Sequence, residues 1–152
     1  MENFVQAFLN GPVPLVFPIH PRTLNRLKKF KLYHMLAISE NIQLLHPVGY
    51  FDFLMLMKNC TFILTDSGGL QEEATTPSIR KPILVLRAST ERPEAIKAGF
   101  AKLVGVDSDA IVSGMQEILD RYPKLPDYSP FGDGKAGKHI IDIVGEFISG
   151  NP

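Results

Sequence analysis

The sequence has one cysteine, no excess of charge of either sign and no apolar run long enough to cross a membrane. Cys60 has no second thiol with which to form a disulfide or a metal site, which favours a reducing compartment. Sixteen basic residues balance sixteen acidic ones, so no large positive field favours nucleic acid or anionic lipid. Residues 1–3 lack the features of a signal peptide. We therefore expect a cytoplasmic protein with no nucleic-acid partner, no membrane partner and no metal site.

The length and composition predict one folded domain over residues 1–152. Compact domains average about 150 residues, and the chain has 152. Hydrophobic residues make up 45% and charged residues 21%, values typical of a globular protein. No linker long enough to divide two domains is present. Because the positive and negative charges balance, any anion has to be bound by local groups.

Short apolar segments alternate with segments of helical periodicity. Strands are predicted at residues 15–17, 42–45, 61–65, 82–86 and 101–106, and helices near residues 4–9, 24–30, 50–59, 108–122 and 140–148 and after residues 70 and 93. Residues 50–59 are apolar nearly all round, which predicts a buried helix. The alternation is typical of an α/β fold with a doubly wound parallel sheet, covered on both faces. Such sheets bind ligands beyond the carboxyl ends of their strands.

The loop at residues 65–69 (TDSGG) follows the third predicted strand. Its two glycines permit a ligand to approach the backbone closely, and the next helix start offers unpaired N–H groups to an anion. Ser67 adds a hydroxyl donor, while Glu72 and Glu73 could accept hydrogen bonds from sugar hydroxyls. An anion site beside a diol site predicts a nucleotide. The alternative is a turn capped by Asp66 or Ser67 with no ligand.

The loop at residues 89–94 (STERPE) occupies the equivalent position after the fourth predicted strand. Arg92 would bring a guanidinium donor fork beside another helix start, at the same edge of the sheet as the first loop. We predict Arg92 as a second anion contact. The alternative is a surface ion pair of Arg92 with Glu91 or Glu94.

His20 and Arg22 follow the first predicted strand. Their position at a strand's carboxyl end, with one imidazole and one permanent charge, favours a ligand role. The alternative for His20 is a buried structural histidine. After the second strand, Phe53 and its neighbours could contact a flat base, or could belong to the core. The basic run over residues 22–31 is typical of a solvated helix face.

Two further combinations are weaker candidates. Ser67 and His20 could be imagined in a hydrolase triad, but the loop lacks the Gly-Xaa-Ser-Xaa-Gly pattern of a nucleophile elbow. Asp133 and Lys135 lie in a glycine-rich loop before the last predicted helix, with no strand end beside them.

Five segments together resemble the carboxyl-terminal half of the non-hydrolysing UDP-N-acetylglucosamine 2-epimerases. In chain order they are residues 17–22 (FPIHPR), 47–53 (PVGYFDF), 65–73 (TDSGGLQEE), 90–94 (TERPE) and 132–136 (GDGKA). The match runs over nearly the whole chain, and TDSGGLQEE followed by TERPE is very specific for that family. The resemblance implies a Rossmann-like domain, the second of two in a GT-B arrangement with the substrate in the cleft between them.

The resemblance also implies roles for the candidate residues and an isomerase reaction without a cofactor. Epimerisation in the family proceeds by elimination of UDP to a 2-acetamidoglucal intermediate and re-addition with the opposite configuration at C2. The implied contacts are Ser67, Gly68 and Gly69 with the diphosphate, Glu73 with the ribose hydroxyls, Phe53 with the uracil, and Arg92 and His20 with the phosphates or the sugar.

The sequence departs from the family pattern in two ways. The family's candidate acid/base carboxylates and an essential histidine belong to the amino-terminal half, which has no counterpart here. We therefore expect a chain that binds UDP or UDP-N-acetylglucosamine but is inactive alone, and that needs an amino-terminal domain or separate subunit. Residues 74–82 (ATTPSIRKP) also form a longer loop than is usual in the family.

Two other functions stay open at this point. The chain could be the donor-binding half of a GT-B glycosyltransferase, although the TERPE and GDGKA segments disfavour that reading. It could also be a non-catalytic UDP-sugar-binding regulatory subunit that joins a partner through the last helix, because the terminal helices carry apolar faces. A homodimer is a further expectation, and the blandest alternative is a fragment without function.

Overall fold

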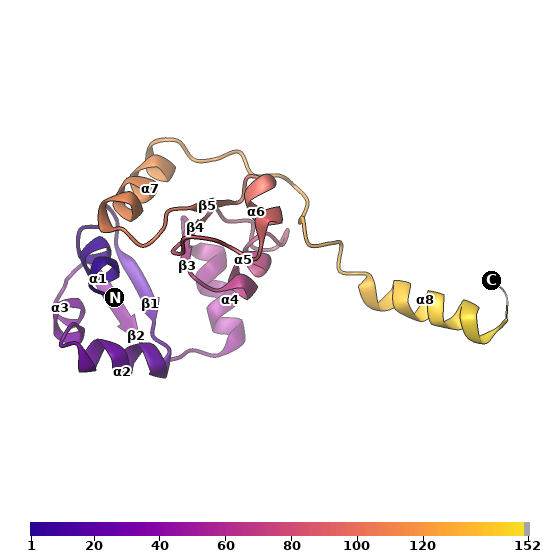
Figure 1. Cartoon of the computed structure of the whole chain (residues 1–152), viewed down its shortest axis with the longest axis horizontal. Coiled ribbons are helices and arrows are strands. Elements are labelled where there is room, and N and C mark those ends of the chain that lie inside the picture. Colours follow the sequence, from indigo (N-terminus) through magenta and orange to yellow (C-terminus); the bar gives the residue numbers. More distant parts are fainter. Residues whose placement is uncertain (151–152) are drawn as a thin grey trace.

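The computed structural model describes residues 1–150, in which parallel strands alternate with helices (Figure 1). The strands are β1 (Leu15–Pro18), β2 (Ile42–Leu45), β3 (Ile63–Thr65), β4 (Ile83–Val85) and β5 (Ala101–Leu103). The helices are α1 (Glu2–Leu9), α2 (Pro21–Lys29), α3 (Tyr33–Ala37), α4 (Tyr50–Asn59), α5 (Gly68–Ala74), α6 (Pro93–Lys97), α7 (Ser108–Asp120) and α8 (Ala136–Ile148). None of the helices in this range is long and apolar enough to cross a membrane.

All the strand pairs are parallel, so the predicted α/β class is confirmed. β1 pairs with β2, and β4 lies between β3 and β5. Within residues 1–150, the hydrogen bonds therefore form a two-stranded and a three-stranded sheet. Each of the five predicted strand segments overlaps one of these strands.

The three-stranded sheet is covered on both faces, which explains the unbroken apolar sequence of β4. Ile83 and Val85 pack into a cluster with residues from α4, α5 and α6, whereas Leu84 and Leu86 pack against α1 and α7. Successive side chains of a strand point to opposite faces. Figure 1 accordingly shows α7 on one side of this sheet and α4 and α5 on the other.

A third cluster surrounds the two-stranded sheet. Its fully buried members come from α1, β2, α2 and α3 and from the residue after β1, and they are Val5, Ile19, Leu27, Leu36 and Ile42. α1 also packs against α7 and so joins the two parts of the molecule.

The prediction that residues 50–59 form a buried helix is wrong. Met57 is the buried residue of α4, and Phe53 and Leu54 pack against the core beside it. On the outer face Phe51 is 80% exposed, and Tyr50 and Met55 are exposed as well. The side chains are apolar on every face, but no described element packs on the outer one. The spacing of apolar residues in α4 therefore could not show which face packs on the core and which is exposed to solvent.

α8 forms as predicted but extends away from the rest of the chain (Figure 1). The segment before it is held to the body by Arg80, which donates to the carbonyl oxygens of Leu125 at 2.6 Å and Pro126 at 2.8 Å. After Phe131 no residue up to Gly150 is buried. The apolar stripe of α8 is consequently open, with Phe147 87% exposed.

Gly114 marks a close approach of α7 to the sheet. A Cβ at this position would lie 2.8 Å from Val104 Cγ1 and 3.4 Å from Leu84 Cδ1. We expect Gly114→Ala to lower the free energy of unfolding by about 1–3 kcal/mol, because an added methyl in a packed core forces its neighbours to shift. Urea denaturation checks this. Gly145→Ala in α8 meets nothing within 4 Å and is the matched control; equal midpoints for the two variants would contradict the prediction.

Cys60 is half-buried after α4, and its thiol donates to the Met57 carbonyl oxygen at 3.1 Å. Burial raises the pKa of the Cys60 thiol, and the nearby Lys81 offsets part of this effect. The thiolate is the reactive form. We therefore expect iodoacetamide to modify the native chain more slowly than the urea-unfolded chain at about pH 8, as followed by mass spectrometry.

The same shift affects stability in a defined pH range. The native state holds the Cys60 proton more tightly than the unfolded state does. The resulting contribution to the free energy of unfolding is fully present below the ordinary cysteine pKa and is lost as the pH rises from there through the raised pKa of the native thiol. Cys60→Ala should remove this loss above about pH 8.5. If the free energy of unfolding falls equally with pH in the variant and in the unaltered chain in that range, Cys60 does not cause the loss.

Candidate functional site

β3 and β4 position the two candidate loops at one edge of the sheet. Thr65 pairs with Val85 at the carboxyl ends of the two strands, so both loops leave from that edge, as predicted. The buried Thr65 hydroxyl accepts the Ser67 N–H at 3.0 Å. This bond reverses the chain directly after β3 and starts α5 within three residues.

The start of α5 has no side-chain cap. Asp66 and Ser67 are exposed, and neither side chain bonds to the first-turn N–H groups. By contrast, Asp107 accepts two first-turn N–H groups at the start of α7, as its position predicted. The cap by Asp66 or Ser67 that the alternative without a ligand assumed is therefore absent, and the first N–H groups of α5 remain available to an acceptor.

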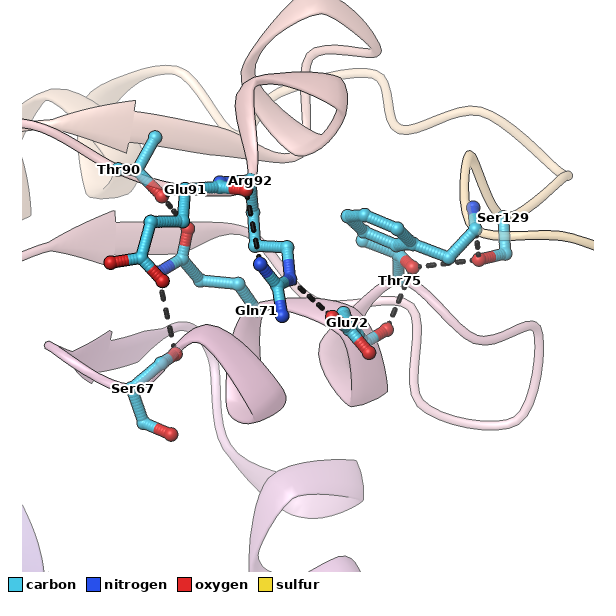
Figure 2. A network of polar contacts seen from close by, with 9 residues as sticks. Ser67, Gln71, Glu72, Thr75, Thr90, Glu91, Arg92 and Ser129 are labelled. Atoms are coloured by element: carbon cyan, nitrogen blue, oxygen red, sulfur yellow. Dashed lines mark hydrogen bonds and ion pairs between the residues drawn. The ribbon is translucent and has the colours of Figure 1, made fainter.

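The Arg92 side chain lies across the start of α5 (Figure 2). A Cβ on Gly68 would stand 3.6 Å from Arg92 Cζ, so the guanidinium is in contact range of this backbone. Arg92 Nε forms an ion pair with Glu72, and Nη1 donates to the Glu91 carbonyl oxygen at 3.0 Å. The alternative of a carboxylate pair with Glu91 or Glu94 is wrong.

The Arg92–Glu72 pair is partly open to solvent. The two side chains are 33% and 41% exposed. Ion pairs this exposed contribute little to stability, since water and salt screen them. An arriving anion can therefore compete with Glu72 for the guanidinium.

The Glu73 carboxylate, unlike that of Glu72, has an oxygen that is buried without a donor in residues 1–150. Its Oε2 atom is buried and has no hydrogen-bond partner among the described residues. A buried carboxylate oxygen without a donor is costly. Glu72 is paired with Arg92 through Oε1, whereas Glu73 has a buried oxygen without a donor in the part of the chain that the structure describes.

Other predicted residues lie elsewhere. His20 is exposed, and its Nδ1 accepts the Arg22 N–H at 3.2 Å, which caps α2; the alternative of a buried histidine is wrong. Arg22 is exposed on α2. In the described part of the chain, no hydrogen bond or ion pair links either residue to Ser67 or Arg92. Phe53 is half-buried against the core.

Two residues that the sequence did not single out hold the loops together. Gln71 is fully buried, with Nε2 donating to the Ser67 carbonyl oxygen at 3.3 Å and Oε1 accepting from the Thr90 hydroxyl at 2.7 Å. Thr90 Oγ1 also accepts the Arg92 N–H at 3.0 Å. The available indication was a threonine two residues before Arg92, typical of a local side-chain turn.

The Asp133–Lys135 candidate is separate from this edge. Both residues are exposed, and the Lys135 backbone N–H, with a smaller effect of its side chain, lowers the pKa of Asp133. Within residues 1–150, no cluster of three His, Cys, Asp or Glu side chains could hold a metal ion.

The parallel sheets, their flanking helices and the loops at the strand ends define a Rossmann-like α/β domain. Comparison with known proteins is consistent with this fold and specifies the family. A family model described as UDP-N-acetylglucosamine 2-epimerase matches residues 1–145. The chain belongs to the UDP-N-acetylglucosamine 2-epimerase family, and the resemblance of its motifs is confirmed.

The individual relatives are similar but much longer. The UDP-N-acetylglucosamine 2-epimerase of Methanocaldococcus jannaschii is 43% identical over 130 residues, covering 86% of this chain and 34% of the relative. That of Campylobacter jejuni is 41% identical over 159 aligned residues, covering 94% of this chain and 40% of the relative. The chain thus spans well under half the length of these relatives.

Solved structures agree in fold. The M. jannaschii enzyme in complex with UDP-GlcNAc and UDP has a TM-score of 0.81 and 39% identity, over 95% of this chain and 39% of that one. The S. aureus MnaA–UDP structure has a TM-score of 0.80 and 34% identity, over 97% and 42%. Fewer residues are left unmatched in each comparison than the 13 residues of α8, so at least part of α8 is matched in both structures.

Proposed function

We propose that this chain is the UDP-binding part of a UDP-N-acetylglucosamine 2-epimerase. The observation that carries the proposal is the meeting of the Ser67 loop and Arg92 at one sheet edge, with Arg92 across Gly68. Related structures in complex with UDP support it. The fold alone would not, since Rossmann-like domains serve many functions.

The diphosphate would bind between the start of α5 and Arg92. Ser67 offers a hydroxyl, Gly68 and Gly69 offer backbone N–H groups, and Arg92 offers a guanidinium already within contact range of Gly68. N–H groups and arginine are the usual ligands of phosphate oxygens. The half-exposed pair with Glu72 would open as the anion takes its place.

The ribose would bind to Glu73. Its buried Oε2 has no donor among the described residues, and two neighbouring hydroxyl groups are donors of the required kind. Phe53 would contact the uracil from α4. We place His20 and Arg22 toward the phosphates or the sugar, where the free face of the His20 ring and the exposed Arg22 can reach a ligand.

The role of this half in the reaction would be to stabilise the leaving group. In elimination, the C2 proton is removed, the C1–O bond breaks with its electron pair going to UDP, and a C1=C2 double bond forms; re-addition reverses these changes at the other face of C2. Negative charge then grows on the diphosphate, where Arg92 and the N–H groups would stabilise it. The proton-transfer groups would come from the complementary amino-terminal half, in the same polypeptide or a separate subunit.

We place the protein in the cytoplasm because the lone Cys60 favours a reducing compartment.

Calorimetric titration with UDP tests the proposal. We expect saturable binding selective for UDP over UMP and ATP. Ser67→Ala and Glu73→Ala should each weaken it by about 1–3 kcal/mol, the usual cost of losing a hydrogen bond to a charged group. Ser113→Ala and Glu94→Ala, both at exposed positions on other helices, are the matched controls. Affinities that do not change in the site variants would refute the assigned roles.

α8 is the surface on which we propose that the complementary half docks. Its stripe of apolar side chains is exposed and comprises Ile140, Ile141, Val144, Phe147 and Ile148. The family match reaches residue 145, so α8 belongs to the shared fold. The matched relatives are more than twice as long, which supplies the chain to cover it.

A two-part experiment tests this docking surface. Sedimentation would be measured for this chain mixed with the M. jannaschii segment that it does not cover. We expect a complex that Phe147→Ser weakens about tenfold or more, since buried aromatic anchors dominate interfaces. Asp142→Ser, on the opposite face of α8, should have no effect. Self-association of this chain alone that Phe147→Ser abolishes would instead assign the stripe to a homodimer.

A further inference from the structure

The structure holds a directional chain of hydrogen bonds between the two loops of the site. The Arg92 N–H donates to Thr90 Oγ1 at 3.0 Å, the Thr90 hydroxyl donates to Gln71 Oε1 at 2.7 Å, and Gln71 Nε2 donates to the Ser67 carbonyl oxygen at 3.3 Å. Figure 2 shows Gln71 reaching from α5 between Ser67 and Thr90. We refer to these bonds as the relay.

The relay admits one orientation of the Gln71 amide. The Thr90 oxygen already accepts from the Arg92 N–H, so its proton is free for an acceptor, and Oε1 is the acceptor end of the amide. The Ser67 carbonyl oxygen accepts the Gln71 backbone N–H at 3.3 Å, and the side-chain amide can add a second hydrogen bond there only through its NH₂ end. A flipped amide would place Gln71 Oε1 against the Ser67 carbonyl oxygen, so that two acceptors would face each other without a proton between them.

The cost of burying Gln71 indicates that the relay has a purpose beyond packing. Gln71 lies in α5 and is fully buried. A buried amide is tolerated only when its hydrogen bonds are made, and an apolar side chain of similar size avoids that requirement. The two hydrogen bonds of the Gln71 amide join Ser67 to Thr90 and thereby fix the distance between the two loops.

We infer that Gln71 and Thr90 are positioning residues that hold Arg92 over the Ser67–Gly69 loop. The inference rests on the proposed function, because it assigns the relay to alignment of the phosphate-binding groups. Thr90 fixes the Arg92 backbone through its hydrogen bond. Glu72 and the Glu91 carbonyl group then orient the guanidinium. Gln71 connects Thr90 to the Ser67 carbonyl oxygen and so fixes the position of Arg92 relative to the Ser67 loop. Neither Gln71 nor Thr90 needs to touch the ligand.

Thr90→Val, which removes the hydroxyl at nearly constant shape, tests the inference, with Thr90→Ser as the matched variant that keeps it. Thr90→Val loses both hydrogen bonds of the hydroxyl. We expect it to raise the Kd for UDP about tenfold or more and to leave the Kd for uridine unchanged. Thr90→Ser should retain wild-type binding of both. Equal weakening of UDP and uridine would indicate a merely structural role and overturn the inference.

A double-mutant cycle identifies the residue through which Thr90 acts. In an Arg92→Ala background, Thr90→Val should have no further effect on UDP binding. A full tenfold effect in that background would refute positioning through Arg92. If Thr90→Val does not fold, Gln71→Met breaks the relay at its other end and is expected to give the same UDP-specific loss.

A measurement without ligand separates this inference from the proposed function. The Arg92 Nε–H resonance in ¹H–¹⁵N spectra of the free chain should exchange with solvent about tenfold faster in Thr90→Val than in Thr90→Ser. Equal exchange would overturn positioning whether or not UDP binds. Faster exchange in Thr90→Val than in Thr90→Ser, in a chain that does not bind UDP, would leave positioning intact and refute the proposed function.

Discussion

The parallel pairing of β3 with β4 is the constraint on which the site depends. Thr65 stands opposite Val85, so two loops that are more than twenty positions apart in the sequence leave the sheet together. Both strands have only three residues, and a strand this short supplies little stability by itself. The hydrophobic residues of β4 that alternate between two core clusters keep the pair in register.

Balanced net charge makes the local electrostatics of this edge decisive. No long-range field draws an anion to the chain, so attraction has to come from Arg92 and the uncapped start of α5. Glu72 neutralises Arg92 in the free chain, and because both are partly exposed this costs little to reverse. The adjacent Glu73 keeps a free acceptor. Two neighbouring glutamates thus differ in their surroundings, since one pairs with Arg92 and the other has a buried oxygen without a donor within residues 1–150.

The strands and most helices could be predicted because they depend on local periodicity. The cap of α7 at Asp107 and the common edge of the two loops followed from the same reasoning. The partner of Arg92 could not be predicted, because Glu72 lies twenty residues away and local pairing suggested Glu91 or Glu94. Gln71 was missed for the same reason, since its partner Thr90 lies on the other loop, nineteen residues further along the chain. The open outer face of α4 was missed because composition does not show which surface is covered.

The two loops at the sheet edge and helix α8 differ in whether the described chain completes their packing. The groups that would hold a diphosphate belong to two loops which the chain's own core and the Gln71 relay align, so their geometry does not require another domain. The apolar stripe of α8 has the opposite property, because nothing within residues 1–150 buries it. A preorganised edge loses less entropy on binding than a mobile one. Under the proposed function, the leaving-group site would therefore form before the complementary half arrives, and docking on α8 would add proton-transfer groups to a site already aligned for the diphosphate.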